Sequence, residues 1–445
     1  MLERRLCGRR PGWQQAITRD GVVYSDTDLP GGGSFSYWVE DAYYQVTVAD
    51  TDNLARACDE LTAMLIEAGD HVIAENLFGR LGIPDFAVPA IVRTWQDDDP
   101  VHHWPSVYGR MDLRWGDDPA LTSVDPDLVH PKLLEYNADT PTCFPESTGA
   151  QWNWLNGNPT VSGDQWNNAF EALVVAWKRN LEIFQQRCRP PISTVHFFHT
   201  SAELSGEDRM NTALVAAAAE QAGFAVKMQY IENVKLETLD SQIVFLDADS
   251  ATPMGYFLDE DGQPVRLAFK LYPWEWLIHE DFGRTALWNT LQRDGTTWVE
   301  PPYKMLWSNK GILPVLWDLY KDHPVRRNFL LPAYFEGDEP LGFRDNCVRK
   351  PLLGREGANV TVFRNGEPVA ENSGGYGSEG YVLQQYAELP SFQTGSGRRH
   401  ALTGVWMIDN EAAGLCFRES EGPITDNLSF FVPHIVKDTP IKGSV

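Results

Sequence analysis

Hydrophobic residues recur along this 445-residue chain with two different spacings. Helical spacing marks 54–69, 165–184 and an alanine-rich stretch at 212–223, and Gly69 and Gly223 are expected to end the first and the last of these helices. Short strand-like runs lie at 194–198, 225–230, 243–246, 265–271, 360–363, 381–385 and 401–408. Mixed helices and strands predict an α/β or α+β architecture.

The composition narrows the class of protein. Acidic residues outnumber basic ones by 62 to 37, and the net charge of −25 argues against a duplex nucleic acid as the main partner. No apolar run approaches the roughly 18 residues of a membrane span. Four arginines precede Pro11, Gly12 and Trp13, where a signal peptide would need its apolar stretch, and the six cysteines are scattered. We therefore expect a cytoplasmic protein with reduced thiols and no membrane partner.

A candidate metal site lies in residues 133–139, LLEYNAD, where apolar and polar residues alternate. In a strand this alternation places three side chains with oxygen donors on one face: Glu135, Asn137 and Asp139. Mg²⁺ prefers such oxygens. Residues 108–113 present Arg110 and Asp112 in the same way, and pairing of the two strands would add a metal oxygen and a guanidinium suited to phosphoryl transfer. By pattern alone, a polar face turned to solvent is an equal alternative.

A glycine-containing loop follows the strand-like run that ends at Lys350. Its two glycines and its arginine, in LLGREGANV (352–360), can hold phosphates through backbone N–H groups and point charges. The loop is not a Walker A motif, and no GxGxxG follows a strand, so the P-loop and Rossmann interpretations fail. A solvated turn is the more common explanation for such a loop by itself.

Two weaker signals complete the candidate chemistry. Lys310 lies just before a predicted helix at 311–320, where anions are favoured, although a plain surface lysine is the alternative. Gln384 and Gln385 end a strand and can hydrogen-bond an adenine edge, although amides there are usually just solvated.

Together these segments resemble the glutathionylspermidine synthetase family, and within it the stand-alone acid–amine ligases that lack an amidase domain. The ordered blocks that carry the resemblance are YGRMD (108–112), LLEYNADTPT (133–142), KLYPWEW (270–276), SNKGILPVLW (308–317), KPLLGREGANV (350–360), Gln384-Gln385 and FVPH (431–434). They span most of the chain, from about residue 8 to 436. An ordered set of this kind is far more specific than any single motif.

The resemblance implies an α+β fold of the ATP-grasp type, with ATP between two lobes. It implies Mg²⁺ ligands at Asp112, Glu135 and Asn137, and catalytic arginines at Arg110 and Arg418. The implied ATP-binding residues are Arg110, Asp112, Lys310, Lys350, Arg355, Gly357, Gln384 and Gln385. The implied substrate-binding residues are Asp139, Thr140, Glu207, Asp208, Trp274 and Glu275, of which the acidic pair 207–208 would receive the amine.

The reaction implied by the resemblance joins a small carboxylic acid or peptide to an amine, of which a polyamine is one candidate, through an acyl phosphate. Residues 1–300 would form the N-terminal and substrate- and Mg-binding part, and 301–445 the ATP-binding lobe with its phosphate lid and a return to the core. We expect one interlaced catalytic unit without an amidase domain. The lysine that follows the late arginine in bifunctional members has no evident match, since only Lys437 and Lys442 remain, so glutathione and spermidine are not assigned.

Two other functions fit parts of the sequence. The 16 tryptophans and 12% aromatic residues would suit a carbohydrate-binding protein, although aromatic residues more often fill cores. A non-catalytic ATP-binding scaffold is disfavoured because no metal or phosphate residue is missing. His102-His103 and the pair His196 and His199 are expected to be core or surface residues and not metal ligands.

Overall fold

A computed structural model describes residues 2–28, 34–96, 103–116, 121, 123, 125–188, 190–247 and 250–437, so His102 and Lys442 lie outside it. Its centre is an antiparallel sheet with the strand order β21-β20-β19-β5-β6, and β18 pairs with β19. These strands are β5 (Tyr108–Arg114), β6 (Lys132–Asn137), β18 (Ser391–Thr394), β19 (Gly397–Ile408), β20 (Glu411–Ser420) and β21 (Phe430–Val432).

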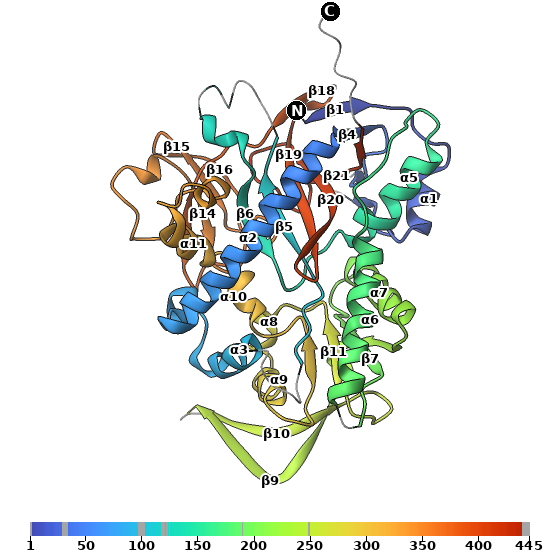
Figure 1. The fold of residues 1–445 in the computed structure, drawn as a ribbon, viewed down its shortest axis with the longest axis vertical. Coiled ribbons are helices and arrows are strands. Elements are labelled where there is room, and N and C mark those ends of the chain that lie inside the picture. Colours follow the sequence, from blue (N-terminus) through green and yellow to red (C-terminus); the bar gives the residue numbers. More distant parts are fainter. Residues whose placement is uncertain are drawn as a thin grey trace, which may run out of the picture.

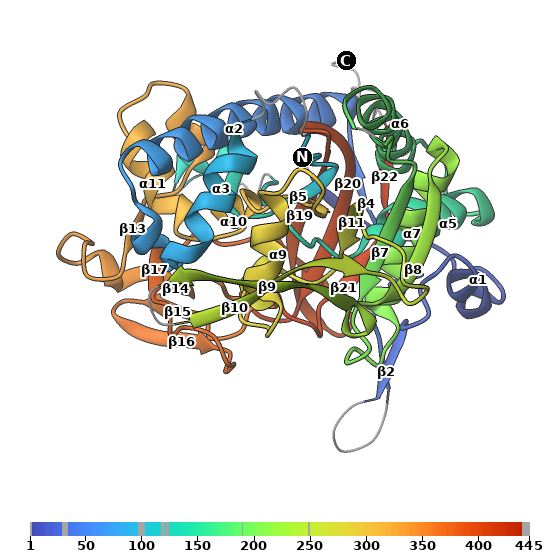
Figure 2. The ribbon, with the colours of Figure 1, turned by 90° about the horizontal axis from the view of Figure 1, so that it is seen from below.

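Two further sheets flank the centre on opposite sides (Figure 2). One is antiparallel, in the order β13 (Ala333–Phe335), β17 (Tyr381–Gln385), β14 (Asn346–Pro351), β15 (Thr361–Arg364) and β16 (Glu367–Glu371). The other is parallel, in the order β12 (Thr297–Val299), β11 (Leu267–Lys270), β7 (Thr194–His199) and β8 (Ala225–Tyr230). The remaining strands are β1 (Glu3–Leu6), β4 (Ala42–Val46) and β22 (His434–Val436) in one sheet, and the hairpins β2 (Asp26–Asp28) with β3 (Ser34–Ser36) and β9 (Lys235–Asp247) with β10 (Ser250–Leu258).

The longest helix, α2 (Val48–Ala74), lies across the central sheet (Figure 1). It begins at a capping box of Thr47 and Asp50, and its apolar face packs on sheet residues such as Met111 and Val405. The other helices are α1 (Trp13–Arg19), α3 (Val88–Trp95), α5 (Gln151–Gly157), α6 (Ala169–Arg187), α7 (Glu207–Ala222), α8 (Trp274–Leu277), α9 (Gly283–Thr290), α10 (Lys304–Trp307) and α11 (Ile312–Tyr320). Because α2 covers one face of the sheet, the polar residues of β5 and β6 face away from it.

All seven predicted strand segments overlap observed strands, and the predicted helices correspond to α2, α6, α7 and α11. Gly223 ends α7 in the left-handed conformation, as predicted, with φ of 107°. The prediction for Gly69 was wrong, because α2 continues to Ala74. Gly69 is buried, and a Cβ there would lie 2.2 Å from Cη2 of Trp95, so its role is to admit the indole against the helix.

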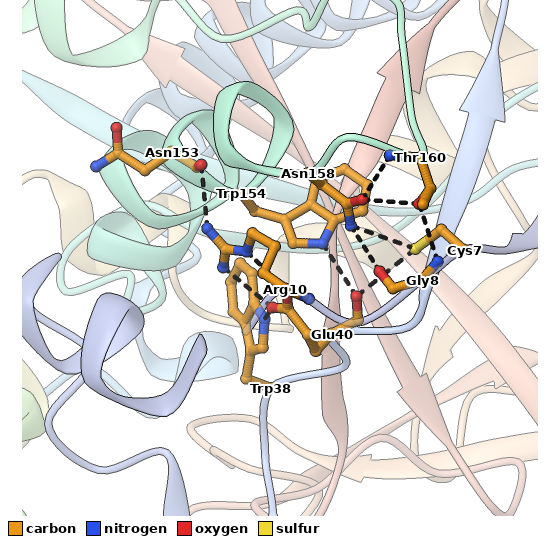
Figure 3. A network of polar contacts seen from close by, with 9 residues as sticks. All are labelled: Cys7, Gly8, Arg10, Trp38, Glu40, Asn153, Trp154, Asn158 and Thr160. Atoms are coloured by element: carbon orange, nitrogen blue, oxygen red, sulfur yellow. Dashed lines mark hydrogen bonds and ion pairs between the residues drawn. The ribbon is translucent and has the colours of Figure 1, made fainter. Parts of the chain in front are cut away.

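A buried network fixes the N-terminal segment to α5 (Figure 3). The Arg10 guanidinium donates to both carboxylate oxygens of Glu40, at 2.7 and 3.0 Å, and to the carbonyl of Asn153 at 3.0 Å. The indoles of Trp38 and Trp154 donate to the side chain and the carbonyl of Glu40. These bonds hold the segment that leads to α1 against Glu40 and the helix α5. Among the described helices, none is both long enough and apolar enough to cross a membrane.

Candidate active site

The central feature of the site is the register between β5 and β6. These strands pair, as considered from the sequence, and their orientation is antiparallel, with Arg110 opposite Asn137 and Asp112 opposite Glu135. Directly opposed residues share a face of an antiparallel sheet, so these four polar side chains project together. The face opposite to them carries Met111 and belongs to the core under α2.

Two carboxylates converge at this point. The Asn137 side-chain nitrogen lies 3.0 Å from Asp112 Oδ2 and 3.4 Å from Glu135 Oε1, so both carboxylates reach a common centre. Two carboxylates and an amide oxygen, presented when the Asn137 side chain turns over, are a donor set that fits Mg²⁺ with phosphates completing the shell. Asp139 does not join them, because its carboxylate binds Lys270 Nζ and the backbone N–H of Trp274, both at 2.7 Å.

Two lysines supply positive charge beside the carboxylates. Lys310 Nζ lies 2.8 Å from Glu135 Oε2 and donates to the Gly354 carbonyl at 2.5 Å. Lys350 Nζ donates to the Leu134 carbonyl at 3.1 Å. Burial opposes ionisation of Glu135, but the charges of Lys310 and then of Lys350 outweigh it and lower the pKa of this carboxyl to about 2. Burial lowers the pKa of Lys350 to about 8.

These groups line a cleft between the central sheet and the flanking antiparallel sheet that contains β14 and β17. The polar lining includes Asp112, Glu135, Lys310, Lys350 and Gln385, with Gly354 and Gly357 from the glycine loop. The apolar lining comprises Leu134, Val348, Val360, Val362, Leu389, Leu402 and Ile424. Gln384 also reaches the cleft, but its amide is engaged: Oε1 accepts from Lys350 at 2.7 Å and Nε2 donates to the Leu133 carbonyl at 2.9 Å.

The glycine loop closes over the cleft through Gly357. This residue has φ of +68°, and a Cβ there would lie 2.7 Å from the Thr425 carbonyl oxygen, so the close contact needs glycine. Arg355, on the same loop, is directed elsewhere. Its guanidinium donates to Glu275 Oε1 at 2.8 Å and to Thr140 Oγ1 at 2.9 Å. The loop thus contacts both the cleft and the neighbouring candidate substrate residues.

Arg110 lies between the cleft and the candidate substrate residues. It forms a two-bonded ion pair with Asp112, at 2.7 and 2.9 Å, and donates to the Thr142 carbonyl at 2.7 Å. Gly404 of β19, opposite Asp112, leaves room for it, since a Cβ at Gly404 would lie 3.0 Å from Arg110 Cδ. Arg418 of β20 donates to the Asp426 carbonyl at 2.7 Å, and Arg110 is close enough to oppose its charge.

Comparison with known proteins gives this arrangement a context. Residues 4–437 match the family described as glutathionylspermidine synthase preATP-grasp. A protein of Haemophilus influenzae named "Putative acid–amine ligase" is 31% identical over 434 residues, which cover 96% of this chain and 97% of that protein. The chain belongs to the glutathionylspermidine synthase family.

Other members of the glutathionylspermidine synthase family are more distant. The bifunctional glutathionylspermidine synthetase/amidase of Escherichia coli is 26% identical over 417 residues, covering 88% of this chain and 59% of that protein. The trypanothione synthetase of Crithidia fasciculata is 26% identical over 385 residues, covering 82% of this chain and 52% of that protein. These proteins are carbon–nitrogen ligases, and this chain is one as well.

A solved structure supports the fold. The glutathione synthetase-like effector of Globodera pallida aligns with 97% of this chain and all of that chain, with a TM-score of 0.53 at 9% identity. The predicted α+β fold of the ATP-grasp type is therefore confirmed.

The expected amine-side residues of this family member lie at the start of α7. Burial raises the pKa of Glu207 to about 7, and the charge of Glu146 adds to the rise while Arg418 opposes it. Burial likewise raises the pKa of Asp208 to about 6, with help from Glu203. Trp274 is fully buried and donates from its indole to the Glu300 carbonyl at 2.9 Å, so its side chain is a packing residue in this structure.

Sequence reasoning missed two buried charged residues near the site. Lys270, the partner of Asp139, opens the KLYPWEW block, and that block was a signal that could have identified it. Glu146 begins a π-helical turn, Glu146–Ala150, and is fully buried. No spacing or motif in the sequence singled it out.

Proposed function

We propose that this glutathionylspermidine synthase family member is a Mg²⁺- and ATP-dependent ligase that joins a carboxylic acid to an amine through an acyl phosphate. The observation that carries the proposal is the convergence of Asp112, Glu135 and Asn137 beside Lys310 and Lys350 in one cleft. Such a set of oxygen ligands and cations suits phosphoryl transfer. An enzyme promotes this reaction mainly by positioning the reacting groups and by stabilising the charge on the phosphates.

We place ATP in this cleft. The apolar side chains of Val348, Val362 and Leu389 offer a wall for the adenine ring. Gln385, the last residue of β17, lines the same cleft. Gln384 has a different task in this proposal, since it holds Lys350 in place. The phosphates would extend toward Lys310 and the loop that contains Gly357, and Mg²⁺, when bound, would neutralise charge on them.

Arg110 is suited to the first chemical step. The acid's carboxylate oxygen attacks the γ-phosphorus, ADP leaves, and the guanidinium offsets charge on the transferring group. In the described structure Asp112 already orients this guanidinium, so its position is set before substrates bind. Arg418, from another strand of the same sheet, would add a second positive charge at the acyl phosphate.

The second step would use the residues beyond Arg110. Thr140 and Glu275 contact Arg355 of the glycine loop, and the buried Asp139 and Trp274 are their neighbours in the sequence. We assign the acid or peptide to this region. Glu207 and Asp208 are the acidic groups on which we place a cationic amine, with a polyamine as one candidate. Exclusion of water here would protect the acyl phosphate until the amine attacks. The six cysteines are free thiols, which suits action in the cytoplasm.

The experiment that tests the proposal measures ADP release over a matrix of acids and amines. Acetate, glutamate and glutathione would be combined with methylamine, putrescine, spermidine and hydroxylamine, with and without Mg²⁺. We expect ADP release that requires one acid, and hydroxamate from that acid when hydroxylamine replaces the amine. Arg110→Ala should lose both, whereas Arg326→Ala, which removes a surface arginine paired with Glu67, should retain them. Amide formation without hydroxamate would exclude a releasable acyl phosphate.

Carbohydrate binding finds little support in the structure. Most tryptophans of the described chain are wholly or largely buried, and the exposed ones are Trp152 and Trp276. Trp276 lies beside Arg355, with 5.9 Å between the guanidinium carbon and the ring centre, so it belongs to the ligase site.

A further inference from the structure

A buried carboxylate outside the assigned site residues lies next to Glu207. Glu146 has no exposed surface and is the first residue of the π-helical turn Glu146–Ala150, a local geometry that is frequent at functional sites. The Tyr24 hydroxyl donates to its Oε1 at 2.9 Å. Its Oε2 accepts no bond of good hydrogen-bond geometry among the described residues, although the Tyr37 hydroxyl is near enough to lower its pKa. A buried carboxylate oxygen left without a donor is costly, which points to a role beyond packing.

Asn211 brings this turn against α7. Its Oδ1 accepts from the backbone N–H of Phe144 at 3.1 Å, and its Nδ2 donates to the Glu207 carbonyl at 3.0 Å. The same amide therefore clamps the residues just before Glu146 to the first turn of the helix that carries Glu207. Glu146 is close enough that its charge acts on Glu207.

The charged and titratable groups that act on Glu207 come from several elements. They are Glu146 of the π-helical turn, Arg418 of β20, Asp208 of the same helix, Tyr24 of the N-terminal segment and Cys143 before the turn. Burial is the largest influence and raises the pKa of Glu207 to about 7, and Glu146 is the next largest. Burial also raises the pKa of Glu146 itself.

We propose that Glu146 is a positioning residue that makes Glu207 the proton acceptor for the amine substrate, an inference that rests on the proposed function. The substrate ammonium gives one proton to the Glu207 carboxylate, and the freed nitrogen lone pair attacks the acyl carbon. The bond between that carbon and the phosphate oxygen breaks, and the second nitrogen proton leaves with phosphate as HPO₄²⁻. The amide keeps one proton, so charge and protons balance.

The chemistry explains why a lone carboxylate would serve poorly. An ordinary glutamate, with a pKa of about 4.3, is too weak a base to take a proton from an alkylammonium group at neutral pH. A like charge held beside it in a dry environment strengthens it as a base. The opposing charge of Arg418 limits the effect, so that Glu207 is still ionised in a useful fraction of molecules near neutral pH.

The test uses a crossed pair of variants. Glu146→Gln removes the charge but keeps an acceptor for Tyr24, whereas Tyr24→Phe keeps the carboxyl group and removes the hydrogen bond. Each variant would be assayed from pH 5 to 9 with the best amine among methylamine, putrescine and spermidine, and separately with hydroxylamine, which is largely neutral at pH 7. Rates would be expressed as kcat/KM for the cationic form of the amine.

We expect the limb on which kcat/KM rises with pH to move to lower pH by about one unit in Glu146→Gln, the size of a typical like-charge effect. It should move less in Tyr24→Phe, which removes a hydrogen bond that favours the ionised form of Glu146 but leaves the carboxyl group. Glu207→Gln should lose about 100-fold or more with the alkylamine, the scale of general-base catalysis, and should form hydroxamate within about threefold of the unmutated rate. An unmoved limb in Glu146→Gln, an equal shift in Tyr24→Phe, or an equal loss with hydroxylamine would each overturn the inference.

Two further measurements keep the outcome decisive. If Glu146→Gln does not fold, the unmutated enzyme still provides the test, because a limb at the ordinary glutamate value of about 4.3 contradicts the role of Glu146. Absence of ADP release and hydroxamate from the unmutated enzyme across the whole panel would instead contradict the proposed ligase function. The two failures are therefore distinguishable.

Discussion

Replacing Glu135 with glutamine removes one negative charge at the point where the proposed metal ligands, the two lysines and the glycine loop meet. The substitution keeps the size of the side chain, so its effects report on charge. In the unmutated protein Glu135 Oε2 lies 2.8 Å from Lys310 Nζ, and Lys350 also acts on the carboxylate. Without it the two lysines face each other in a partly buried cleft with less compensating charge, and the proposed metal site loses one of its ligands.

The effect on stability can be worked out from the ionisation of Glu135. Its pKa is about 2 in the fold against an ordinary value of 4.5. Because the folded-state pKa is lowered, the stabilisation is fully present above pH 4.5 and is lost as the pH falls through about 2. A shift of this size corresponds to about 3 kcal/mol of unfolding free energy. Glu135→Gln should therefore unfold more easily at neutral pH, and the difference should shrink at acid pH.

The assay combines urea unfolding at several pH values with Mg²⁺-dependent ADP release. We expect activity to fall about 100-fold or more and the Mg²⁺ requirement to rise, because a directly coordinating carboxylate is missing. Glu67→Gln is the matched control, since Glu67 is also paired, with Arg326 and Tyr320, but lies outside the cleft. Near-normal turnover of Glu135→Gln at ordinary Mg²⁺ concentrations would refute the metal assignment.

Three further predictions concern glycines. The loop 354–358 should resist trypsin better when Mg²⁺ and a non-hydrolysable ATP analogue are bound, since a charged glycine loop has few apolar contacts of its own; equal digestion would count against a phosphate lid. Gly357→Ala should raise the KM for ATP about tenfold or more through the strained contact described above, whereas Gly337→Ala, also at positive φ but facing open space, should leave the KM unchanged. Gly69→Ala should cost about 1–3 kcal/mol in urea unfolding by displacing Trp95, and unchanged stability would contradict the packing.

The strand framework of the site was predictable because its signals are local. Alternation in 108–113 and 133–139 predicted two strands with polar residues on one face, and the observed register places Asp112 opposite Glu135. The same alternation misplaced Asp139. The strand ends at Asn137, and beyond it the backbone turns so that Asp139 meets Lys270. A period-two pattern does not reveal where a strand ends.

Other features depend on contacts between distant segments and have no local signal. Gly69 has the sequence context of a helix end, yet the helix continues because Trp95 occupies the space that a side chain would fill. Arg355 lies in a loop that reads as phosphate-binding, but its guanidinium reaches Glu275, 80 residues away in the chain. Such pairings follow from the tertiary fold, and a single sequence without its fold cannot supply them.

The distribution of charge in the site suggests why the two substrates of the proposed reaction need not compete. Lys310 and Lys350 lie on the cleft side of Asp112, where a polyphosphate would bind. Glu207 lies beside Thr142, and Asp208 follows it at the start of α7, close enough to Arg355 of the glycine loop to feel its charge; a cation would bind at this acidic pair. Arg110 contacts both regions, through Asp112 on one side and the Thr142 carbonyl on the other. An acyl phosphate formed at Arg110 would therefore be within reach of an amine that had approached from the opposite side, and ATP and amine could be bound at the same time.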